Sequence, residues 1–161
     1  MCSCAVRTRT TACRSTAWPS RTGTARTAGT GRRAWSGPWP RPGPECILVA
    51  HSLGCLLVAC WAAQTQRPVR AALLVAAPDP QGPAFPAAAK GFGALPRQRL
   101  PFETRIIASR NDPYAGPAFS RQVAAAWGAE LQAAGEAGHL NAQSGLGSWP
   151  AAWQQVQGWR L

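Results

Sequence analysis

The distribution of apolar residues divides this chain into two parts at Pro44-Glu45. Residues 45–161 contain short continuous apolar runs and longer segments with helical spacing, whereas residues 1–44 contain neither. The first part has no Leu, Ile or Phe and only one valine, Val6, among many Arg, Thr, Ala, Gly, Trp and Pro. Such a composition cannot bury enough apolar surface to offset the entropy lost on ordering. We therefore expect residues 1–44 to be an irregular or disordered Arg-rich segment, and residues 45–161 to form one folded domain.

The second part alternates between the patterns of buried strands and of helices. Continuous apolar runs predict strands at 46–50, 71–76 and 104–109, with a weaker one at 129–133. Helices are expected at 53–63, 117–127 and 150–157, while the Pro- and Gly-rich segment 81–101 predicts a long loop or broken helix. Strands that alternate with helices indicate an α/β fold with a mostly parallel sheet.

The same pattern predicts which residues form the core. We expect it to be built from the centres of the three main strands and from one face of the helix at 117–127. Its members would be Ile47, Leu48, Val49, Leu73, Leu74, Val75, Ile106, Ile107, Phe119, Val123 and Trp127.

The net charge of +11 lies mainly in the first part. Residues 1–44 hold eight arginines and no acidic residue, whereas residues 45–161 hold nine basic residues against six acidic ones. The folded part is therefore not strongly basic, and nucleic acid is not the expected partner. Nucleic-acid binding by the first segment stays an alternative, because its arginines could contact phosphates and Trp18, Trp35 and Trp39 could stack on bases.

The chain shows no feature of a membrane or exported protein. No apolar run reaches the eighteen or so residues of a membrane span, and no apolar stretch follows the first arginines as an export signal requires. We expect a cytoplasmic protein whose six cysteines are reduced thiols. Cys2 and Cys4 have no second ligand pair at zinc spacing, so no metal site is expected.

The most informative segment is Ile47-Leu-Val-Ala-His-Ser-Leu-Gly-Cys55. It places Ser52 on a tight turn between a buried strand and a helix, with the small residues Ala50 and Gly54 two positions to either side. This geometry lifts a serine hydroxyl above the sheet and directs the helix N-terminus, with the backbone N–H of Leu53, at a developing oxyanion. Ser52 is therefore the candidate nucleophile. The plainer interpretation is a helix N-cap serine.

Two histidines and two aspartates could complete a catalytic triad. His51 directly precedes Ser52 and should point elsewhere, so His139, on a loop after the last strand, is the candidate base. Asp79 and Asp112 each follow a strand and keep the order serine, acid, histidine. We favour Asp112, because of the two strands that precede these aspartates its own lies nearer in sequence to the His139 loop.

The segments around these residues resemble a known family. Ala50-His-Ser-Leu-Gly-Cys55, Ala108-Ser-Arg-Asn-Asp-Pro-Tyr114 and the run from Ala137-Gly-His-Leu-Asn141 to Ser148-Trp-Pro150 are similar to the small YdeN-like, retinoblastoma-binding-protein-like serine hydrolases. The resemblance covers about residues 45–161. It implies a compact α/β-hydrolase domain, a triad of Ser52, Asp112 and His139, no cofactor, and a poorly defined physiological substrate. From the acyl-transfer chemistry of such a triad we expect a small-molecule ester or amide as the substrate.

Residues 1–44 do not match the start of that family. Its members begin with a buried strand and a Pro-Gly loop with a His-Trp segment, which supplies a second oxyanion N–H. We therefore expect a hydrolase fold that lacks its first strand or strands, with catalysis impaired by the missing donor. A non-catalytic binding module on an incomplete hydrolase fold is the alternative. For residues 81–101, with Phe85, Phe92 and Leu95, two interpretations stay open, part of an acyl pocket or plain packing.

The abrupt change of amino-acid composition at residue 45 leads to a prediction about the gene. If residues 1–44 are read out of frame, another frame upstream of codon 45 should encode an apolar strand, a Pro-Gly loop and a His-Trp pair. Sequencing the coding DNA and translating all three frames tests this. A gene in which no frame encodes such a segment would instead indicate a genuine basic arm.

Overall fold

The structure is a computed structural model that describes residues 5–7, 43–89, 92 and 94–160. Strands and helices alternate along most of it, as the apolar pattern predicts. The strands are β1 (Ala5–Arg7), β2 (Ile47–His51), β3 (Ala71–Val75), β4 (Glu103–Ala108) and β5 (Glu130–Ala133). The helices are α2 (Leu53–Ala62), α3 (Pro117–Trp127) and α4 (Pro150–Gly158), with 3₁₀ turns at Ala87–Ala89 and Ala142–Ser144.

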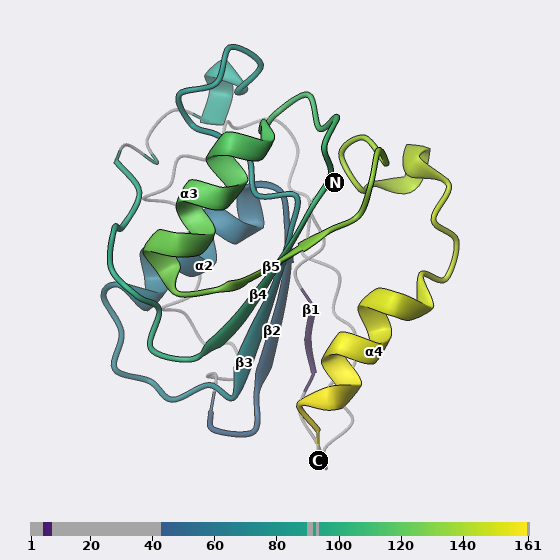
Figure 1. The fold of residues 1–161 in the computed structure, drawn as a ribbon. Helices are drawn as coiled ribbons and strands as arrows, with labels where there is room; N and C mark the ends of the chain where they lie inside the picture. The colour runs from purple at the N-terminus through teal and green to yellow at the C-terminus, as the bar shows by residue number, and fades with distance from the viewer. Residues whose placement is uncertain (1–4, 8–42, 90–91, 93, 161) are drawn as a thin grey trace.

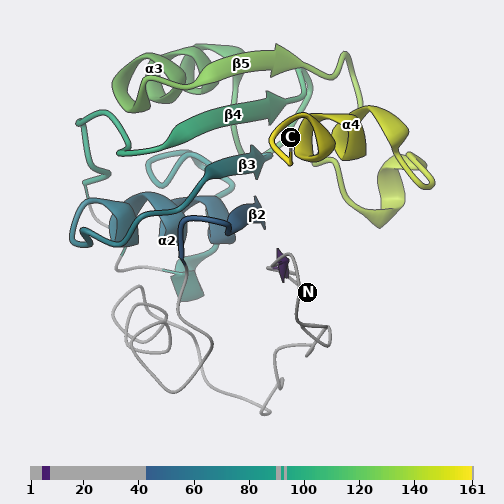
Figure 2. The same ribbon diagram turned by 90° about the horizontal axis from the view of Figure 1, so that it is seen from below.

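The strands form one sheet in the order β1-β2-β3-β4-β5. β2 to β5 are parallel, and β1 pairs antiparallel with β2 at one edge. Helices α2 and α3 cover one face and α4 lies against the other (Figures 1 and 2). The α/β fold expected from the sequence is thus confirmed.

Both faces of the sheet are buried in its central strands, which explains the continuous apolar runs of β2 and β3. Side chains alternate between two core clusters. Leu48, Leu74 and Ile106 join the cluster under α2 and α3. Ile47, Leu73 and Ile107 join the cluster under α4. The predicted core is therefore confirmed, with Val49 and Phe119 packed at its margins.

The N-terminal segment differs from expectation at the three residues that the structure describes. Ala5–Arg7 form β1, in register with Val49 to Ile47, where irregular backbone was expected. An edge strand needs only backbone hydrogen bonds to its neighbour, so a composition without large apolar residues does not prevent it. The other predictions for residues 1–44 concern Cys2, Cys4, Trp18, Trp35 and Trp39, which lie outside the described residues.

The long connection after β3 packs on the core rather than standing apart. Phe85, Phe92 and Leu95 are partly buried against the cluster under α2 and α3. This placement favours the packing interpretation of residues 81–101. Within the described ranges, no helix is both long and apolar enough to cross a bilayer.

Trp127 should be the most stabilising single side chain of α3. It is 1% exposed, and its indole Nε1 donates to the carbonyl of Pro96 at 2.9 Å. Replacing it with alanine should therefore lower the free energy of unfolding by about 3–5 kcal/mol, measured by urea titration. The matched control is Trp153→Ala on α4, where the residue is 39% exposed. Equal losses in the two variants would contradict this assignment of the core.

Candidate active site

The carboxyl ends of the parallel strands meet at one edge of the sheet, and the candidate residues follow them. Register pairs His51 with Val75, Val75 with Ile107, and Ala108 with Ala133, so β2 to β5 end side by side. Ser52 follows β2 directly, Asp112 lies on the loop after β4, and His139 on the loop after β5. The topology thus gathers residues from three distant parts of the chain.

Ser52 occupies a strained turn between β2 and α2. Its backbone has φ 56° and ψ −128°, values that non-glycine residues rarely adopt. Its N–H donates to the carbonyl of Val75 at 2.9 Å, which ties the turn to the neighbouring strand. Gly54 lies close to Ala50 across the turn, and a Cβ added at Gly54 would make an ordinary van der Waals contact with that of Ala50, at 3.5 Å.

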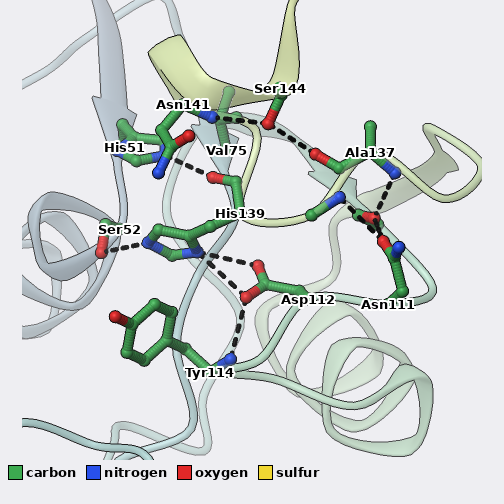
Figure 3. A network of polar contacts seen from close by, with 12 residues as sticks. His51, Ser52, Val75, Asn111, Asp112, Tyr114, Ala137, His139, Asn141 and Ser144 are labelled. Atoms are coloured by element: carbon green, nitrogen blue, oxygen red, sulfur yellow. Dashed lines mark hydrogen bonds and ion pairs between the residues drawn. The ribbon is translucent and has the colours of Figure 1, made fainter.

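The Ser52 hydroxyl does not cap the helix that it precedes. Although Ser52 is the N-cap residue of α2, its side chain makes no capping hydrogen bond. Its Oγ instead lies 2.8 Å from Nε2 of His139 (Figure 3). This contact, between residues 87 positions apart, argues against the N-cap interpretation of the motif.

The other ring nitrogen of His139 meets the carboxylate of Asp112. Nδ1 lies 3.0 Å from each of the two carboxylate oxygens. The Asp112 side chain is 2% exposed and that of His139 is 11% exposed, so the pair is shielded from water. The carboxylate is held in place because its Oδ1 also accepts the backbone N–H of Tyr114 at 2.9 Å.

The competing candidates lie in other arrangements. Oδ1 of Asp79 accepts the N–H of Gln81 at 2.8 Å, and this hydrogen bond closes a local turn after β3. The His51 ring contacts the backbone of His139, with its Nε2 2.8 Å from that carbonyl.

The loop that carries His139 is fastened to the loop that carries Asp112. Oδ1 of Asn111 accepts the N–H of Gly138 at 2.8 Å, and Oγ of Ser109 accepts that of Ala137 at 2.9 Å. Ser109 is 2% exposed. The surface ion pair between Arg110 and Glu136 also joins the loops, but at 3.9 Å and 67% exposure of both side chains it contributes little.

The sequence pattern missed these supporting residues. Ser109 and Asn111 are typical of any turn, so their types alone did not single them out. Tyr114 was also missed; its ring centroid lies 4.5 Å from that of His139. The spacing of Ser109, Asn111 and Tyr114 around Asp112 was the one available signal.

A groove on the surface lies away from this site. It is shallow and is lined by Arg99 to Thr104, Gly128 and Glu130, at the amino ends of β4 and β5 and so at the sheet edge opposite Ser52. Within the described part of the chain, no three His, Cys, Asp or Glu side chains gather as a metal site would require. Cys46, Cys55 and Cys60 are buried.

Comparison with known proteins identifies the family of this chain. The model of the serine hydrolase family matches residues 41–158, most of the chain. This chain belongs to the serine hydrolase family. The family resemblance expected from the three motifs is therefore confirmed. No curated protein sequence gives a significant match.

Solved structures of hydrolases share the fold. A YdeN-like hydrolase of Pectobacterium atrosepticum is 28% identical, with a TM-score of 0.63 over 83% of this chain and 66% of that chain. The ydeN gene product of Bacillus subtilis is 23% identical, with a TM-score of 0.62 over 73% and 67%. An esterase domain from Rhodothermus marinus is 17% identical, with a TM-score of 0.57 over 84% and 70%. The chain thus spans about two thirds of the length of these proteins.

The two histidines should be opposite tautomers in their neutral forms. Nδ1 of His139 faces a carboxylate and must carry the hydrogen, which leaves Nε2 to accept from Ser52. Nε2 of His51 faces a carbonyl and must itself carry the hydrogen. ¹⁵N NMR of histidine-labelled protein tests this, since the chain has only two histidines. Two identical tautomers would contradict the hydrogen-bond network.

Proposed function

We propose that this chain is an ester hydrolase in which Ser52, His139 and Asp112 form a catalytic triad. The observation that carries the proposal is the 2.8 Å contact between a serine Oγ on a strand-to-helix turn and an imidazole Nε2. The carboxylate on the opposite ring nitrogen supports it, because this sequence of contacts is the arrangement that activates a serine. Residues 45–161 would hold the whole triad.

The reaction is acyl transfer from an ester to water. Ser52 Oγ attacks the ester carbonyl while Nε2 of His139 takes the hydroxyl proton. The same nitrogen then returns the proton to the departing alcohol, and an acyl-serine remains. Water activated by His139 attacks this second ester, which releases the acid and restores the serine.

Asp112 orients the base rather than exchanging protons. Its two oxygens face Nδ1, so the imidazole keeps its hydrogen there and presents an unprotonated Nε2 to Ser52. Its burial strengthens this interaction, because little water competes for the carboxylate. When His139 becomes positively charged during the attack, the same carboxylate stabilises that charge.

Within the described residues, the backbone N–H of Leu53 is the candidate oxyanion donor. Leu53 begins α2, so its N–H has no acceptor within the helix and adds to the positive end of the helix dipole. The family's second donor is expected from an N-terminal loop, and residues 1–40 lie outside the part of the chain that matches the family. Since the loss of one donor costs about 10²–10³ in rate, we expect slow turnover.

The proposal predicts covalent labelling at one serine. A fluorophosphonate probe should react with the wild-type chain and leave Ser52→Ala unlabelled, because among the serines that the structure describes only Ser52 has an imidazole nitrogen at its hydroxyl. Mass spectrometry of the labelled peptide identifies the site, and Ser148→Ala, at an exposed serine, serves as the control. Labelling of Ser52→Ala at the wild-type rate would remove Ser52 from the mechanism.

The assignment of His139 as the base and Asp112 as the acid predicts a large loss of rate when either is replaced. His139→Ala should lower kcat for a p-nitrophenyl ester by about 10²–10⁴-fold, since it removes the general base. Asp112→Asn should cause a loss of similar scale because it favours the wrong tautomer of His139.

Asp79→Asn is the matched control for Asp112→Asn. Its amide oxygen can still accept the N–H of Gln81, so the turn after β3 is kept and kcat should change only slightly. A large loss in Asp79→Asn together with a small loss in Asp112→Asn would reverse the assignment of the acid.

A further inference from the structure

His51, the last residue of β2, holds the backbone of the residue proposed as the base. Its ring Nε2 lies 2.8 Å from the carbonyl oxygen of His139, across 88 positions of sequence. Its ring also lies beside the His139 imidazole, with centroids 4.9 Å apart and planes inclined by 58°. Figure 3 shows it across His139 from Tyr114, so two rings flank the imidazole.

The contact falls where the His139 loop needs support. Gly138 has φ 56° and Leu140 has φ 49°, so His139 stands between two residues in the left-handed region. A left-handed leucine is strained and persists only where its surroundings hold it. Leu140 is 5% exposed in the core cluster under α4, and the His51 hydrogen bond fixes the peptide between it and His139.

The amino-terminal side of the loop is fastened by different groups. Asn111 and Ser109 accept the N–H groups of Gly138 and Ala137, and the Ser144 hydroxyl donates to the carbonyl of Ala137 at 2.6 Å. These contacts fix the backbone before His139, whereas His51 contacts His139 itself.

His51 is also bonded through its peptide to the nucleophile. Ser52 is the next residue, and its N–H is tied to Val75 in the sheet. The donor and the acceptor of the proton are therefore both held by the dipeptide His51-Ser52. Ser52 carries the hydroxyl, and His51 holds the backbone of His139, whose imidazole receives the proton.

We propose that His51 is a positioning residue that sets the distance between His139 and Ser52. This inference rests on the proposed function. A displacement of about 1 Å at a reacting group can cost about 10²-fold in rate, so loss of one anchor among several should lower kcat by about ten-fold. KM should not change, because His51 acts through His139 and not on the substrate.

Three replacements at position 51 separate the hydrogen bond from size and polarity. His51→Gln places an amide N–H at about the reach of the imidazole Nε2. His51→Met has similar length and no donor, and His51→Asn has the donor on a side chain one methylene too short. Steady-state hydrolysis of p-nitrophenyl acetate should show a ten-fold lower kcat for Met and Asn, with most of the loss recovered in Gln.

The same replacements in a His139→Ala background test whether His51 acts through the base. There His51→Met should cause no further loss, because the group that it positions is gone. A full ten-fold loss in that background would overturn the proposal, and so would equal kcat values for Met and Gln.

Amide hydrogen exchange of the full chain gives a readout that needs no activity. A peptide covering residues 134–142 should exchange faster in His51→Met and His51→Asn than in wild type and His51→Gln. If the wild-type chain neither hydrolyses the ester nor labels at Ser52, the proposed function is wrong and exchange alone decides the role of His51. Equal exchange in all four proteins would reject the anchor.

Discussion

The strained backbone at Ser52 is the constraint on which the site depends. A φ of 56° in a non-glycine residue costs about 1–3 kcal/mol and persists only where neighbouring structure determines it. Here β2 enters the turn fully paired with β3, the Ser52 N–H binds Val75, and α2 leaves the turn with six buried residues. The free energy gained by burying those side chains exceeds the cost of the strained backbone, since each large side chain stabilises the fold by about 1.5–3 kcal/mol.

The carboxyl ends of the parallel strands lie at one edge of the sheet, and this brings other loops to the turn that carries Ser52. Because β2 to β5 end in register, loops that are distant in sequence emerge beside one another. Their relative position is then refined by side chains that bind backbone, with Asn111 and Ser109 joining the last two loops. Each such hydrogen bond contributes only about 0.5–1.5 kcal/mol to stability. Their value is geometric, because they determine where His139 stands.

In the proposed mechanism, the groups that hold the base and the groups that bind the oxyanion come from different parts of the sequence. The contacts of His139 with Ser52, Asp112, His51 and Tyr114 all arise within the part that matches the serine hydrolase family. The second oxyanion donor that the family resemblance implies belongs to the unmatched part. In the proposed mechanism, the described residues therefore supply the contacts for proton transfer and one backbone N–H, that of Leu53, for the oxyanion.

The sequence by itself determined the strands, the helices and the turn that carries Ser52, because each depends on local apolar pattern and on residue size within a few positions. It narrowed the acid to two aspartates, since both follow a strand. Only the tertiary structure distinguished their settings: the carboxylate of Asp112 faces His139, whereas that of Asp79 closes its own turn. The tertiary structure also decided the contacts of His51, Ser109 and Asn111, whose partners lie on segments that only sheet register brings together. It placed Ala5–Arg7 at the sheet edge for the same reason, because backbone pairing leaves no trace in side-chain composition.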